Sequence, residues 1–145
     1  NKLSEKVIAY ACALGDKKRE SKFFLSSGVT GSSMHSIDKP ESDRNRFVPY
    51  HVQGVLLESM DEFVSYEGVE FPNHIKIDVD GIEHLILSGA KNILRNKECK
   101  TVFVEVNDSF ESQANGVRQT LLECGFGMLE KIDSGRQSCN QVWVK

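Results

Sequence analysis

Two short apolar segments that end in polar residues constrain the fold of this chain more than any other feature. Residues 74–83 read His-Ile-Lys-Ile-Asp-Val-Asp-Gly-Ile-Glu, and residues 102–107 read Val-Phe-Val-Glu-Val-Asn. Apolar residues between them recur at helical spacing: Ile82, Leu85, Ile86, Ala90, Ile93 and Leu94. The order strand, turn, helix, strand predicts a βαβ crossover with two parallel strands, and hence an α/β fold.

Polar side chains gather where these two strands are expected to end. In parallel sheets, ligands bind outside the carboxyl ends of the strands, so we expect any chemistry near Asp78, Asp80, Glu105 and Asn107. Alternation along the strand places Lys76 on the same face as Asp78 and Asp80. Because charged groups in such a strand need partners, Glu105 is the expected counter-ion of Lys76. The pair has either a functional role or the purely structural role of a buried ion pair between strands.

The two carboxylates of the first segment have different expected roles. Asp80 and Glu83 have the spacing of a capping box, with Asp80 at the N-cap of the following helix. Asp78 has no such structural role in the sequence pattern. It is therefore the preferred candidate for a functional carboxylate.

The motif of residues 76–83, Lys-Ile-Asp-Val-Asp-Gly-Ile-Glu, resembles the signature of the FkbM family of S-adenosylmethionine-dependent methyltransferases. That family usually has Lys-Ile-Asp-Val-Glu-Gly-Ala-Glu, so Asp80 and Ile82 are mild departures. Further matches occur in the same order along the chain: Ala13-Leu14-Gly15-Asp16, Gly31-Ser32-Ser33, Ser59-Met60-Asp61, Leu87, Gly89-Ala90 and Val104-Glu105-Val106. The family's glycine-rich loop and the acidic residue after its second strand have no counterpart before Ala13.

The resemblance implies a single α/β domain over residues 1–145. Its sheet would be a Rossmann-like methyltransferase sheet, incomplete on the N-terminal side, with a C-terminal antiparallel strand. The implied activity is O-methylation of a sugar or another small hydroxyl compound, provided that an upstream cofactor-binding half is present. The implied sites are catalytic Asp78, Glu105 and Lys76, cofactor-binding Ala13, Leu14 and Asp78, and substrate-binding His35, Ser33 and Asn107.

Several alternatives remain open from the residues. Asp78 could act as the general base or as a ligand of the cofactor amine. Asp78, Asn107 and Asp108 could offer oxygens to Mg²⁺, although members of the family generally do not use a metal. Without the glycine-rich loop, we expect S-adenosylmethionine to bind weakly or not at all. The chain could then be a non-catalytic remnant or an interaction module.

Composition narrows the class of protein. The chain has 145 residues, 39% hydrophobic content, a net charge of −3 and a pI of about 5.8, which argues against a nucleic-acid partner. No apolar run has the length of a membrane span, and no signal peptide is visible. The four cysteines lack metal-ligand spacing, so we expect buried free thiols and a cytoplasmic location. The first residue is Asn1 rather than Met, which indicates missing upstream residues.

The N-terminal half is expected to contain a β-hairpin and a long loop. Residues 6–14 and 21–25 are its predicted strands, and residues 26–45 its loop. Residues 46–57 form a predicted strand that is broken near Pro49 and Gly54. Ser59 is the expected cap of a short helix that ends at Val64.

The C-terminal half is expected to close the sheet. A helix is predicted over residues 110–124, with Asn107, Asp108 or Ser109 as its cap and Gly125 as its stop. Two strands, 127–132 and 141–144, are predicted after it. The resemblance implies the sheet order 75, 102, 141, 127, with strand 141–144 antiparallel and no pairing between strands 6–14 and 75–79. Trp143, which lies among valines, is expected in the core. The free edge of strand 75–79 predicts a homo-oligomer.

Overall fold

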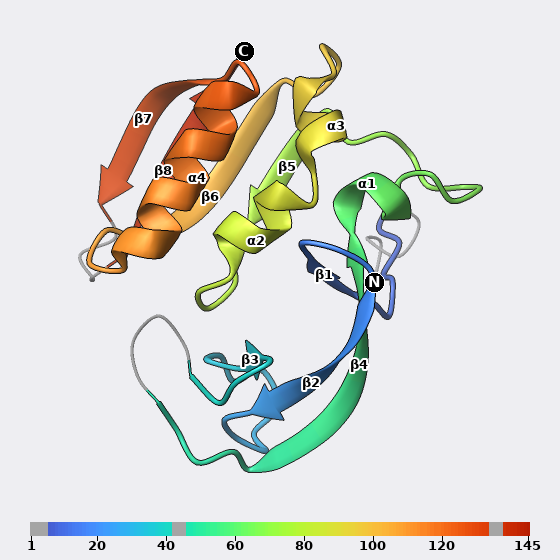
Figure 1. The fold of residues 1–145 in the computed structure, drawn as a ribbon, viewed down its shortest axis with the longest axis vertical. Helices are drawn as coiled ribbons and strands as arrows, with labels where there is room; N and C mark the ends of the chain where they lie inside the picture. The colour runs from blue at the N-terminus through green and yellow to red at the C-terminus, as the bar shows by residue number, and fades with distance from the viewer. Residues whose placement is uncertain (1–5, 42–45, 134–137) are drawn as a thin grey trace.

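Two four-stranded sheets lie beside each other in the computed structural model, which describes residues 6–41, 46–133 and 138–145 (Figure 1). Helices cover one of the sheets, and a long curved strand leads from a short helix into the other. Among the described residues, no helix is long and apolar enough to cross a membrane. The chain therefore has a mixed α/β fold with two mixed sheets.

The C-terminal sheet has the strand order that the sequence predicts. It runs β5-β6-β8-β7, formed by β5 (His74–Ile77), β6 (Thr101–Asn107), β8 (Ser138–Val144) and β7 (Gly127–Asp133). β5 and β6 are parallel, whereas β8 is antiparallel to both of its neighbours. The parallel βαβ crossover and the antiparallel closing strand are thus confirmed.

Three helices cover one face of this sheet (Figure 1): α2 (Glu83–Ser88), α3 (Lys91–Arg95) and α4 (Glu111–Glu123). The helical pattern of residues 82–94 forms two short helices, because the chain turns between them at Gly89 and Ala90. Val102, Val104 and Val106 of β6 are fully buried, as the alternation in a strand with one covered face requires. Trp143 is also buried in this core, as predicted.

The start of α4 differs from the prediction. Its N-cap is Phe110, and no side chain of the described residues caps it. Asn107 Oδ1 instead accepts a hydrogen bond from the Ser109 amide, which stabilises the turn before the helix. The predicted stop is confirmed, since Gly125 has a φ of 87°.

The N-terminal sheet contradicts the predicted hairpin. Its order is β1-β4-β2-β3, formed by β1 (Ala13–Gly15), β4 (His51–Ser59), β2 (Arg19–Leu25) and β3 (Ser36–Ile37). β4 lies between β1 and β2, and β1 pairs with it in parallel, so residues 6–14 and 21–25 cannot form a hairpin. Of the first predicted strand, only Ala13 and Leu14 belong to a strand of the structure, as part of β1.

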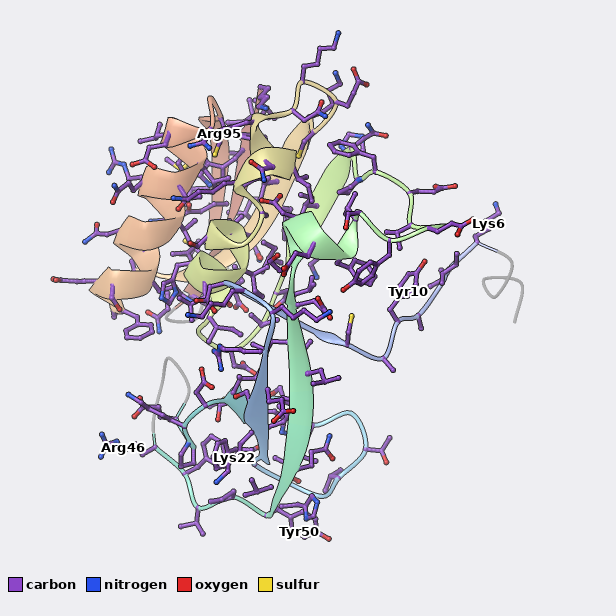
Figure 2. The ribbon with its side chains drawn as sticks, turned by 45° about the vertical axis from the view of Figure 1, so that its right-hand side comes forward. Lys6, Tyr10, Lys22, Arg46, Tyr50 and Arg95 are labelled. Carbon is purple, nitrogen blue, oxygen red and sulfur yellow. The ribbon has the colours of Figure 1, made fainter. Side chains whose placement is uncertain are left out.

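Two other predictions for this half are also wrong in part. The predicted loop of residues 26–45 contains β3, which pairs with β2, and its residues 42–45 lie outside the described ones. β4 begins at His51 and continues without a break through Gly54, which pairs with Lys22. Tyr50, just before β4, lies at the far end of this sheet from the helices, as Figure 2 shows.

The short helix α1 (Met60–Phe63) joins the two sheets. The predicted cap is confirmed: Ser59 Oγ accepts a hydrogen bond from the Glu62 amide at 3.2 Å and donates one to Glu62 Oε2 at 2.8 Å. The next residue, Asp61, reaches across to α3. Its carboxylate accepts hydrogen bonds from the backbone amides of Asn92 (3.0 Å) and Ile93 (2.9 Å), so it caps a helix that no neighbour in sequence caps.

The cysteines are free, and Cys99, Cys124 and Cys139 are buried, as expected, whereas Cys12 is exposed. Cys12 belongs to the segment that precedes β1. This segment contacts α1 through Tyr10, whose ring centroid lies 4.9 Å from that of Phe63.

Gly89, between α2 and α3, lies in close contact with the N-terminal sheet. A Cβ atom there would lie 2.2 Å from the carbonyl oxygen of Gly15 in β1 and 3.1 Å from Cβ of Ser59. The Gly89 carbonyl also accepts a hydrogen bond from the Asp61 amide at 3.0 Å. A side chain at Gly89 would therefore separate the two sheets.

We expect Gly89→Ala to destabilise the fold by about 1–3 kcal/mol, because the methyl group must displace backbone atoms rather than a flexible side chain. Urea unfolding followed by circular dichroism measures the change. Gly54→Ala is the matched control, since no atom lies within 4 Å of a Cβ at that position. An equal loss of stability in both variants would contradict this account of the junction.

Candidate functional site

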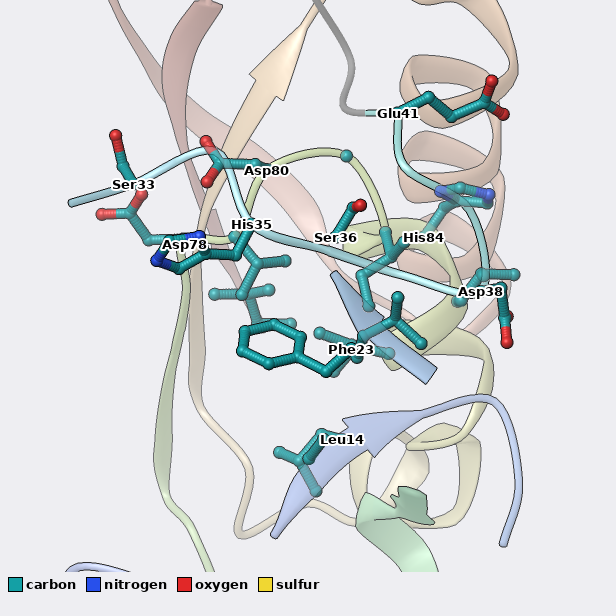
Figure 3. A pocket seen from close by; sticks show the side chains of 18 of the residues that line it. Leu14, Phe23, Ser33, His35, Ser36, Asp38, Glu41, Asp78, Asp80 and His84 are labelled. Atoms are coloured by element: carbon teal, nitrogen blue, oxygen red, sulfur yellow. The ribbon is translucent and has the colours of Figure 1, made fainter. Parts of the chain in front are cut away.

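A cavity of about 930 Å³ lies between the two sheets (Figure 3). One wall is the carboxyl end of β5 with the loop and helix α2 that follow it, and the other is formed by β1, β2, β3 and residues near them. Its volume is in the range of small-molecule sites, roughly 300–1,000 Å³. The cavity thus lies at the end of β5 where the sequence predicts chemistry.

Most of the predicted site residues line this cavity. They are Ala13, Leu14, Ser33, His35, Lys76 and Asp78. Glu105 and Asn107 do not line it. Asn107 is 2% exposed and its amide donates a hydrogen bond to Gln113 Oε1 at 2.9 Å, so it belongs to the core behind the site.

The predicted buried pair of Lys76 and Glu105 is wrong. Lys76 Nζ lies 2.7 Å from Asp78 Oδ2, and the two side chains are 62% and 47% exposed. Glu105 accepts a hydrogen bond from Ser138 Oγ and acts on Lys76 only through its charge. The reason is that β5 is an edge strand with its Lys76 face open to solvent, so the ammonium group needs no buried partner.

The ion pair changes the acidity of both groups. The hydrogen bond from the Lys76 ammonium group lowers the pKa of Asp78. Asp78 in turn raises the pKa of Lys76. Asp78 is therefore ionised at neutral pH and is a weak base.

Asp80 is not a helix cap. The residue at the N-cap of α2 is Ile82, and Asp80 Oδ2 accepts a hydrogen bond from the Met34 amide at 2.5 Å instead. Met34 belongs to the segment before β3 and has a φ of 68°, which is uncommon for a residue with a side chain. Asp80 thus connects the loop after β5 to the opposite wall of the cavity.

Glu83, the other half of the predicted capping box, is a buried link between strand ends. It is 1% exposed. Its carboxylate accepts hydrogen bonds from the Val79 amide at 3.3 Å and from Gln113 Nε2 of α4. Because Gln113 also accepts from the Asn107 amide, the link joins the end of β5 to the end of β6. It fixes the loop that carries Asp78 and Asp80.

Burial of Glu83 raises its pKa from 4.5 to about 7, because the hydrogen bonds to the ionised form do not compensate fully for desolvation. Below pH 4.5 the carboxyl group is protonated in both the folded and the unfolded state. Between about 4.5 and 7 only the unfolded chain loses the proton, so this group lowers the free energy of unfolding as the pH rises.

We expect Glu83→Gln to remove this pH dependence, because glutamine does not ionise. The free energy of unfolding of the wild type should fall, relative to the variant, by about 3 kcal/mol between pH 4.5 and pH 8. Urea unfolding at several pH values measures the difference. Glu123→Gln, at an exposed carboxylate of α4, is the control and should keep the wild-type profile. Parallel profiles of wild type and Glu83→Gln would contradict the assignment.

The cavity residues that were not predicted from the sequence include Phe23, Asp38 and His84. Arg19 binds Asp38 through two hydrogen bonds of 2.6 Å and lowers its pKa, and this pair fastens the segment after β3 to β2. Phe23 and His84 bear no sequence signal of a site, because each lies within an ordinary strand or helix pattern. Only the packing of the two sheets brings them to one cavity.

His35 has partners within its own segment. Its Nδ1 accepts a hydrogen bond from the Ser26 amide at 3.1 Å, and its ring packs edge-on against Phe23 at 5.7 Å. Ser32 Oγ lies 3.4 Å from its Nε2. His35 thus helps to build the wall, in addition to lining the cavity.

The oxygens considered for Mg²⁺ lie in different ion pairs. Asp78 pairs with Lys76, whereas Asp108 pairs with Lys131 at 2.5 Å. Within the described ranges, no group of three or more His, Cys, Asp or Glu residues has the arrangement of a metal site.

Comparison with known proteins agrees with the motif at the end of β5. The family model of the methyltransferase FkbM domain matches residues 1–128. The chain belongs to the FkbM methyltransferase family. Its fold is similar to the crystal structure of methyltransferase FkbM from Methylobacillus flagellatus KT, with a TM-score of 0.62 and 10% sequence identity. That match covers 100% of this chain and 30% of the other, so the chain spans 30% of the length of that relative. A search of curated proteins gave no match.

Proposed function

We propose that the chain is the acceptor-side part of an S-adenosylmethionine-dependent O-methyltransferase. The observation that carries the proposal is the cavity at the carboxyl end of β5, where the motif residue Asp78 and the β1 residues Ala13 and Leu14 line one space. Family membership supports methyl transfer as the reaction. In this proposal, β5, β6 and β8 are part of a Rossmann-like sheet.

One side of the cavity has a lining that suits S-adenosylmethionine. Leu14 and Ile77 offer apolar surface for a flat base such as adenine, and the carboxylate of Asp78 offers negative charge for a cationic ligand. When bound, the cofactor supplies an electrophilic methyl group. The lowered pKa of Asp78 favours its role as a ligand of positive charge over a role as general base.

Positioning contributes more to such a reaction than proton removal. Holding the two reactants in place can supply roughly 7–11 kcal/mol. A general base adds a factor of about 10²–10⁴, or roughly 3–5 kcal/mol. Since the sequence has no glycine-rich loop of the family's kind, we propose that this chain by itself binds the cofactor weakly.

A second function, that of an interaction module, is favoured by one specific feature. β5 is an edge strand, and a second cavity of about 440 Å³ lies beside it, lined by Leu14, Met60, Phe63 and Ile75 among others. A free strand edge next to apolar surface can pair with an added strand. We propose that such a strand, from a second copy or from further polypeptide, would complete the donor side.

The test is a nuclear magnetic resonance titration of the 145-residue chain with S-adenosylmethionine and, separately, with its uncharged thioether product. We expect weak binding, with amide shifts at Leu14 and in the loop that carries Asp78. Asp78→Asn should weaken binding of the sulfonium compound about 10-fold or more, because it removes a charged partner. Glu67→Gln, exposed and outside both cavities, is the control.

If Asp78→Asn weakened the binding of both compounds equally, Asp78 would bind the amine that they share rather than the sulfonium. Shifts confined to residues outside the cavity would contradict the proposed function. Sedimentation of the same samples reports whether a second copy adds to the free edge.

A further inference from the structure

The two walls of the main cavity belong to different sheets, and a hydrogen bond joins them near Asp78. Asp80 Oδ2, on the loop after β5, accepts this bond from the Met34 amide of the opposite wall at 2.5 Å. Figure 3 shows Asp78 and Asp80 at the same end of the cavity as Ser33 and His35. The hydrogen bond therefore connects the walls at this end.

Met34 is held firmly on its own side of the cavity. Its φ of 68° is a left-handed conformation, which a residue with a side chain keeps only where surrounding contacts hold it. Ser26 holds both neighbours of Met34: its hydroxyl donates to the Ser33 carbonyl oxygen at 2.8 Å, and its amide donates to His35 Nδ1 at 3.1 Å. Since β3 follows and pairs with β2, the Met34 amide is fixed to the N-terminal sheet.

Asp80 is held in the same way by the C-terminal sheet. The Val79 amide donates a hydrogen bond to the buried carboxylate of Glu83 at 3.3 Å, and the Gly81 amide donates one to the Val79 carbonyl oxygen at 3.0 Å. The hydrogen bond between Asp80 and Met34 therefore joins two ordered walls. It can form only when the two sheets have the separation seen in this structure.

A second contact between the two halves of the chain lies at the other end of α2. Asp80 precedes this helix and Gly89 follows it. At Gly89 the packing is tight, since a Cβ atom there would lie 2.2 Å from the Gly15 carbonyl oxygen, and the Asp61 amide donates to the Gly89 carbonyl oxygen at 3.0 Å. If the sheets separate, this junction is the pivot, and the Asp80 end is the one that opens.

We propose that the hydrogen bond between Asp80 and Met34 is the latch of a hinged cavity. When it is formed, it holds the two walls together at the Asp78 end. When it breaks, the sheets rotate apart about the Gly89 junction, and this end opens so that a ligand can enter or leave. The inference concerns access to the cavity and does not depend on the proposed function.

The strength and the position of the bond suit a latch. A hydrogen bond to a charged group shifts an equilibrium by about 10- to 100-fold, so a single bond keeps the closed state predominant and still lets it open. By contrast, the carboxylates of Asp78 and Asp38 pair with cations of their own sheets, Lys76 and Arg19. Those two ion pairs can stay formed while the sheets separate.

Spin labels on the two halves of the chain measure the opening directly. Cysteines for labelling are introduced by His51→Cys at the start of β4 and Arg118→Cys in α4, both at exposed positions. Cys12 is exposed and is replaced by serine, whereas the remaining cysteines are buried: Cys99, Cys124 and Cys139. Pulsed electron paramagnetic resonance gives the distance distribution between the labels, and nuclear magnetic resonance gives the exchange rates of the backbone amides.

We expect Asp80→Ala to lengthen and broaden the distance distribution and to raise the exchange rate of the Met34 amide by about 10- to 100-fold, because the closed state loses its latch. Asp80→Asn keeps an oxygen that can accept the hydrogen bond but removes the charge, so its distribution should lie between those of the wild type and Asp80→Ala. Glu67→Ala, exposed and outside both cavities, is the control and should change neither readout.

An unchanged distance distribution in Asp80→Ala would overturn the inference even if the Met34 amide exchanged faster, since the bond would then act only locally. If Asp80→Ala does not fold, amide exchange in the wild type decides. After correction for intrinsic rates, the Met34 amide should exchange faster than the Asp61 amide at the junction. Equal rates would mean that both bonds open only on unfolding, and the inference would be wrong. No readout uses S-adenosylmethionine, so failure of the cofactor titration affects the proposed function alone.

Discussion

The buried carboxylate of Glu83 is the interaction on which the geometry of the site depends. It is bound from one side by the Val79 amide and from the other by Gln113, which in turn binds the Asn107 amide. These contacts join the carboxyl ends of both parallel strands to the helices that cover them. Burial of an ionisable group is unfavourable, and the hydrogen bonds that Glu83 accepts offset part of this cost.

The two sheets contribute different walls of the cavity and are joined at a narrow junction. Gly89 allows the α2–α3 turn to touch β1, and Asp61 binds the start of α3 from α1. Beyond this junction the sheets separate, which leaves the cavity and the free edge of β5. The Asp80 contact with the Met34 amide then connects the opposite walls near the motif. A small molecule in this space would touch both sheets at once.

The site was predictable where the residues lie close together in the sequence. Lys76 and Asp78 follow from strand alternation and from the family motif, and both line the cavity. Glu105 and Asn107 were placed at the correct sheet edge, but neither lines the cavity. The Glu105 side chain accepts a hydrogen bond from Ser138 of β8, and the Asn107 side chain accepts one from the Ser109 amide. His84 was missed because a histidine in a short amphipathic helix has no distinctive pattern. Its place in the cavity lining depends on the packing of the two sheets.

The order of the C-terminal sheet came from the family resemblance. By itself the sequence determined the parallel βαβ unit, the Ser59 cap and the stop at Gly125, which depend on local periodicity, capping chemistry or backbone conformation that neighbouring residues encode. Only the tertiary structure decided that β4 separates β1 from β2 and that Glu83 is a buried link rather than part of a cap. Strand pairing and burial depend on groups far apart in the chain, so their free energies cannot be read from local spacing.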